Sequence, residues 1–83
     1  MSDKRNLIEI YRHIGSTVKY YIYLNELLFS SHKDEPDKSR LILIKRYDKK
    51  ISDDNINSIR EIVGSGEDIG YASLKSIERL LQS

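Results

Sequence analysis

The sequence predicts an α+β fold, in which helices pack on one face of a small antiparallel sheet. Three observations lead to this class. Apolar residues recur at helical spacing near both ends of the chain, they alternate with other residues over 17–30, and they form a compact run at 41–47. A chain of 83 residues is expected to form a small single domain, 1–83, near the lower size limit for folding without help.

The first element is predicted to be an N-terminal helix over residues 3–14. Leu7, either Ile10 or Tyr11, and Ile14 recur at helical spacing, and Gly15 follows as a stop signal. Three turns of helix bury little surface alone, so this helix is expected to pack on another element.

Residues 17–30 change to the period of a strand, because β-branched and aromatic residues alternate along them. A two-residue turn at residues 25–26 would pair Leu24 with Leu27 and make a hairpin. Asn-Glu is a weaker turn pair than Asn-Gly, because Glu disfavours positive φ. A helix over residues 20–31 fits the same side chains and remains the alternative, and it would make the chain a small helical bundle.

A polar stretch over residues 30–40 holds the only proline and is predicted to be a loop. The apolar run that follows, LILIKRY at residues 41–47, is too short for a helix. It is predicted to be a buried strand that pairs with the preceding strands, which gives a sheet of two or three strands.

Two C-terminal helices are predicted to pack on one face of this sheet. Ser52 is a capping residue, Ile51 and Ile56 are placed to staple the first turn, and Gly64 ends the first helix. The second helix is expected over residues 71–82, after the turn GSGEDIG.

Charge is unevenly divided along the second half of the chain. Residues 38–50 contain six cations and the single acid Asp48, whereas from residue 51 onward three cations face six acids. The cations bracket the apolar strand, and this basic stripe is where we expect a partner to bind. Its cations are Lys38, Arg40, Lys45, Arg46, Lys49 and Lys50.

The tyrosines suggest a second part of the same site. If Tyr20 lies in the core, strand alternation puts Tyr21 and Tyr23 together on the other face as a half-exposed pair. Tyrosine is common at interface hot spots. The predicted partner-binding residues are therefore Tyr21, Tyr23, Lys38, Arg40, Lys45, Arg46, Tyr47, Lys49 and Lys50.

These residues favour a small non-enzymatic protein that regulates or inhibits another protein by direct contact. Self-association as a homodimer belongs to the same hypothesis, because an exposed strand can pair with a second copy. Size and composition are typical of accessory proteins of phages, viruses and mobile elements. A simpler explanation of the stripe is that cations flank an apolar run to keep an edge strand soluble.

Nucleic-acid binding is the alternative function. Cations beside exposed aromatic side chains on a sheet, here Tyr21, Tyr23 and Tyr47, are suited to binding single-stranded nucleic acid by charge and stacking. The C-terminal helices offer another surface, because GYASLKSIERLL loosely resembles the recognition helices of small repressors. A net charge of −3 from residue 51 onward argues against that surface. Its candidate residues are Tyr71, Ser73, Lys75, Ser76 and Arg79.

Enzymatic chemistry is not expected, and neither is a cofactor or a metal. The chain has no cysteine, and no pattern places a serine beside His13 or His32. The acidic loop around His32 matches no calcium motif. No segment resembles a signal peptide or a membrane span, so we expect an intracellular, cytoplasmic protein, located in the host cytoplasm if the protein is viral.

Overall fold

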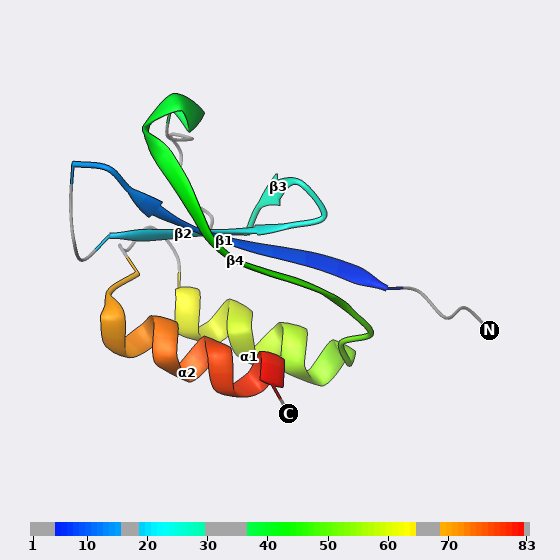
Figure 1. Cartoon of the computed structure of the whole chain (residues 1–83). Coiled ribbons are helices and arrows are strands. Elements are labelled where there is room, and N and C mark those ends of the chain that lie inside the picture. The colour runs from blue at the N-terminus through cyan, green and yellow to red at the C-terminus, as the bar shows by residue number, and fades with distance from the viewer. Residues whose placement is uncertain (1–4, 16–18, 30–36, 65–68, 83) are drawn as a thin grey trace.

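In residues 5–15, 19–29, 37–64 and 69–82, which the computed structural model describes, the chain forms a four-stranded antiparallel sheet and two helices (Figure 1). The elements are β1 (Asn6–His13), β2 (Tyr20–Leu24), β3 (Leu27–Leu28), the 3-10 helix η1 (Lys38–Arg40), β4 (Leu41–Lys49), α1 (Asp53–Val63) and α2 (Tyr71–Gln82). The strand order is β3-β2-β1-β4, and both helices lie on the same face. The α+β class is thus confirmed, but the numbers of helices and strands differ from the prediction.

The predicted helix over residues 3–14 is wrong, because this part of the chain forms the central strand β1. Ile8 and Ile10 are both fully buried with one residue between them, which is the period of a strand and not of a helix. Ile14, which the helical pattern required to be buried, is exposed. The physical reason is pairing with distant segments, because β1 hydrogen-bonds to β2 on one side and to β4 on the other.

The predicted hairpin is confirmed, and the alternative helix over residues 20–31 is wrong. Leu24 pairs with Leu27 across the two-residue turn, as the sequence predicts. Asn25 and Glu26 have φ angles of 51° and 72°, and a type I′ turn requires positive φ at both central positions. The strain expected for Glu at this position is therefore present in the structure.

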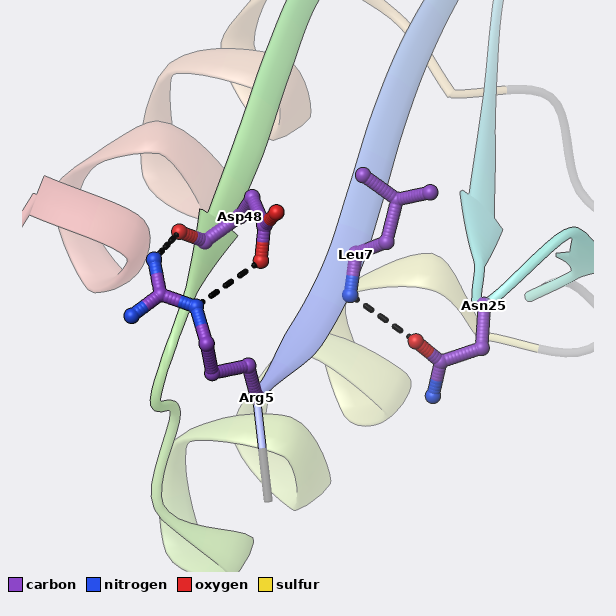
Figure 2. A network of polar contacts seen from close by, with 4 residues as sticks. All are labelled: Arg5, Leu7, Asn25 and Asp48. Carbon is purple, nitrogen blue, oxygen red and sulfur yellow. Dashed lines mark hydrogen bonds and ion pairs between the residues drawn. The ribbon is translucent and has the colours of Figure 1, made fainter. Parts of the chain in front are cut away.

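Asn25 also extends the pairing of β1 with β2 beyond the end of β2. Its backbone N–H donates to the carbonyl oxygen of Leu7 at 2.7 Å, and its side-chain Oδ1 accepts from the N–H of Leu7 at 2.8 Å (Figure 2). Its Nδ2 donates to Oδ1 of Asn6 at 3.1 Å. These three bonds fix the turn to the start of β1, which helps Asn25 hold its left-handed conformation.

The core lies between the helices and the two central strands. Ile8 and Ile10 of β1 and Ile22 of β2 pack against both helices. Tyr20 is buried in the same core, and its backbone N–H donates to the carbonyl oxygen of Ile69 at 3.1 Å just before α2. The helices contribute Ile59, Val63, Leu74, Ile77 and Leu81.

Both helices lie where the sequence places them. The side-chain oxygen of Ser52 accepts from the N–H of Asn55 at 3.1 Å and caps α1. Gly64 ends α1 at a φ of 67° and donates its N–H to the carbonyl oxygen of Arg60. Most of the turn GSGEDIG lies outside the described residues. Neither α1 nor α2 has the length and apolar content that a membrane-crossing helix needs, and the described residues contain no other α-helix.

Replacing Glu26 with glycine is expected to stabilise the fold by about 0.5–1 kcal/mol. Glycine adopts positive φ without the clash of a Cβ atom, although part of the gain is offset by its greater freedom in the unfolded chain. Urea unfolding followed by circular dichroism measures the difference. Glu26→Ala is the matched control, because it removes the carboxylate but keeps the Cβ, and it should change stability by less than about 0.5 kcal/mol. Equal stabilisation by both variants would show that the carboxylate, and not the backbone, carries the strain.

Candidate functional site

The apolar run LILI forms the first half of β4, and it is exposed. A strand here was predicted and is confirmed, but its burial was predicted wrongly. Ile42, Leu43 and Ile44 are 42%, 45% and 42% exposed. The reason is the strand order, which puts β4 at the sheet edge, and the small helix layer, against which Tyr47 is the one apolar residue of this strand that packs. Figure 1 shows the η1 end of β4 rising away from both helices.

The outer side of β4 has no strand partner within the described parts of the chain. Eight of the nine residues of Leu41–Lys49 pair with β1 on the inner side. The register shifts between Ile10, which pairs with Lys45, and Tyr11, which pairs with Leu43, so Ile44 is left without a partner in β1. Ile44 is thus the extra residue of a β-bulge. An edge strand presents unpaired N–H and C=O groups along its free side, and these can bind the backbone of another extended segment.

The start of β4 is fixed by a short capped turn. Oδ1 of Asp37 accepts from the N–H of Ser39 at 3.1 Å, and this bond to the backbone holds the pKa of Asp37 below its usual value. The carbonyl oxygen of Arg40 accepts from the N–H of Ile14 at 2.8 Å, so the turn also joins the end of β1. The free edge therefore begins at a defined position.

The basic stripe is divided between the two faces of the sheet. Lys45 pairs with Ile10, and Lys49 pairs with Asn6, so both lie on the helix side. Nζ of Lys49 donates to the carbonyl oxygen of Leu81 at 2.6 Å, and this bond satisfies a carbonyl near the end of α2. Arg46 pairs with Glu9 on the opposite face.

The only acid of the stripe is already bound to a cation. Arg5 donates from Nε to Oδ1 of Asp48 at 3.1 Å, and its Nη2 donates to the carbonyl oxygen of the same residue (Figure 2). Both side chains are 61% exposed, so this pair contributes little to stability. The effect of the pair on the charge of the edge is larger than its effect on stability. Arg5 compensates the negative charge of Asp48, the only acid of the stripe.

The tyrosines do not form the exposed pair that the sequence predicts. Tyr21 is half-buried, but Tyr23 is only 1% exposed. The Tyr23 ring meets the Tyr11 ring edge-on, with centroids 5.4 Å apart, and Nζ of Lys38 lies 5.0 Å from its centroid. Tyr23 is thus part of the packing on the face of the sheet opposite the helices, here called the open face. Its predicted exposure is wrong.

Tyr47 lies on the other face of the sheet from Tyr21 and Tyr23. It pairs with the buried Ile8, and its ring packs against the core. Its hydroxyl is buried and finds no hydrogen-bond partner among the described residues. The three tyrosines therefore give no continuous surface on which bases could stack, and the prediction that Tyr47 is an exposed aromatic beside the other two is wrong.

The open face carries two residues that the helical prediction for residues 3–14 concealed, Tyr11 and His13. Tyr11 pairs with Tyr21, and the His13 ring lies 6.2 Å from the Tyr21 ring. The alternation of Ile8 and Ile10 with Glu9 was the signal in the sequence that would have placed them there.

The alternative surface on α2 is polar and mixed in charge. Tyr71 is exposed, and Nζ of Lys75 lies 5.4 Å from its ring centroid and 4.0 Å from a carboxylate oxygen of Glu78. Ser76 and Arg79 line the groove between the two helices, and Glu61 lies in the same groove. Ser73 is half-buried. Carboxylates beside these cations oppose the approach of phosphates.

Comparison with known proteins gives no relative, since no protein-family model, curated protein or solved structure matches this chain.

The pKa of Tyr11 lies above its ordinary value of 10.0, chiefly because of burial and also because of the negative charge of Glu9, while Arg46 opposes the shift. Glu9→Gln is expected to lower this pKa toward 10.0, and Arg46→Gln to raise it further. A titration of labelled tyrosine followed by NMR measures both shifts. Lys75→Gln, on α2, is the matched control and should leave the pKa of Tyr11 unchanged. A rise in the pKa of Tyr11 in Glu9→Gln would contradict this account of the open face.

Proposed function

We propose that this chain is a non-enzymatic protein-binding module, which regulates or inhibits another protein by adding a segment of that protein to the free edge of β4. The observation that carries the proposal is the exposed edge itself. The nine residues of β4 have no strand partner on their outer side among the described residues, and three consecutive apolar side chains on this strand are exposed.

Exposed apolar residues on a long edge strand are unusual in proteins that have no partner for it. Natural sheets shorten such strands or cover them, because a free edge promotes association. The cations of β4 and the bulge at Ile44 protect this edge in part, but Ile42, Leu43 and Ile44 keep close to half of their surface in water. A bound segment would cover these side chains and bond to the strand backbone at the same time.

The proposed surface differs from the one that the sequence suggests. Lys45, Arg46 and the exposed apolar run belong to it, whereas Tyr23 is buried and Tyr47 is half-buried against the core, so neither ring forms part of it. Tyr21 keeps partial exposure on the open face, but it lies two strands away from the β4 edge.

The edge is tested by removing its exposed apolar side chains. Ile42→Ser combined with Ile44→Ser should abolish the retention of a protein partner from a nuclease-treated extract of the expressing cells. Ile14→Ser combined with Leu27→Ser is the matched control, because both residues are exposed and neither belongs to β4. The control variant should retain the same partner as the unmodified chain, at moderate salt.

The opposite results would overturn the proposal. If the β4 variant retains the partner as well as the control does, the edge is not the site. If the unmodified chain retains no protein but shifts the mobility of DNA or RNA, with an affinity that falls steeply as salt rises, the nucleic-acid alternative takes its place.

A further inference from the structure

The free edge of β4 has two halves of different chemistry. Its first half, residues 41–44, is apolar and exposed except for the half-buried Leu41, and its second half, from Lys45 to Lys49, carries cations on both faces of the strand. Side chains of an added strand lie beside those of β4, so each half of β4 favours a different kind of side chain in that strand. Apolar residues fit beside the first half, and carboxylates fit beside the second.

We propose that the segment which adds to β4 is an extended strand with an apolar half and an acidic half. This inference rests on the proposed function and deepens it by assigning the chemistry of the partner. In an antiparallel arrangement the acidic residues come first in the partner and the apolar residues follow, because the two chains run in opposite directions.

Charge argues against a second copy of this chain as the occupant. Residues 38–50 hold six cations and one acid, and Arg5 already binds that acid, Asp48. In an antiparallel pairing of β4 with a second β4, the cationic half of each copy would lie beside the apolar half of the other, so neither set of cations would have carboxylates next to it. An acidic strand places carboxylates beside these cations and apolar residues beside the apolar half.

The placement of individual cations supports a strand as the ligand. Lys45 lies on the helix side of the sheet with its Nζ 5.8 Å from the Tyr47 ring centroid, and Arg46 lies on the open side opposite Glu9. Successive side chains of an added strand also point to alternate faces. Two neighbouring acidic residues of the partner can therefore each lie beside one of these cations.

The probe is a capped peptide of about ten residues, the length of an ordinary strand, with Glu and Asp in its first half and alternating Val and Thr in its second. Two control peptides carry Lys in place of the acids, or the two halves in exchanged order. Binding is followed by NMR on the labelled full chain, with hydrogen exchange of the β4 amides and light scattering in parallel.

The acidic peptide is expected to shift the amide signals of residues 41–49, to slow exchange of outward-facing amides of β4, and to bind at least about tenfold more tightly than the Lys peptide. Lys45→Gln combined with Arg46→Gln should weaken its binding about three- to tenfold. Lys75→Gln combined with Arg79→Gln is the matched control on α2 and should leave the affinity within about twofold.

Three outcomes would overturn the inference, and they differ in what they leave of the proposed function. Equal binding of the acidic and Lys peptides at β4 would keep the edge as the site and remove its preference for acids. A concentration-dependent mass above 9.7 kDa that the Ile42→Ser, Ile44→Ser variant abolishes would make a second copy the occupant. Peptide-induced shifts confined to α1 and α2 would place the site outside the edge, against both proposals.

Discussion

Burial of the two central strands under two short helices is the constraint on which the rest of this structure depends. The two helices together contribute five buried side chains, and these side chains cover Ile8, Ile10 and Ile22 of the sheet. A helix layer of this size covers one face of two strands and reaches little further. The apolar half of β4 and the open face of the sheet are therefore left without a covering helix in the described residues. The exposed edge on which the proposed site is built follows from that limit.

Local chemistry in the sequence was sufficient to predict the hairpin, the helix caps and both C-terminal helices. In each case the signal lies within a few residues of the element it defines, as with Asn25 and Glu26 in the turn or Ser52 and Gly64 at the ends of α1. Such signals act through the backbone of their own segment, so they remain visible when the rest of the fold is unknown.

The nature of β1 and the exposure of β4 depend on contacts between distant segments. Over residues 6–13 the apolar residues fit both a helical and a strand period, and pairing with β4, whose residues lie 28 to 43 positions further along the chain, decides between them. The same pairing places LILI at an edge. A compact apolar run is typical of a buried strand, and only the strand order shows that this one is exposed. The burial of Tyr23 likewise depends on Tyr11 and Lys38, which come from other elements.

A nucleic-acid ligand and an acidic strand require different arrangements of cations on a sheet. The arrangement on β4 fits an acidic strand better. Phosphates follow one another along a single path, so a nucleic-acid site gathers its cations and its stacking rings on one face. Here Lys45 and Arg46 lie on opposite faces of the sheet, and Tyr47 is separated from Tyr21 by the sheet itself. An added β-strand alternates its side chains between the same two faces. In an antiparallel second copy of β4 the same cations would lie beside apolar residues and not beside carboxylates, so the proposed acidic partner complements β4 better than β4 complements itself.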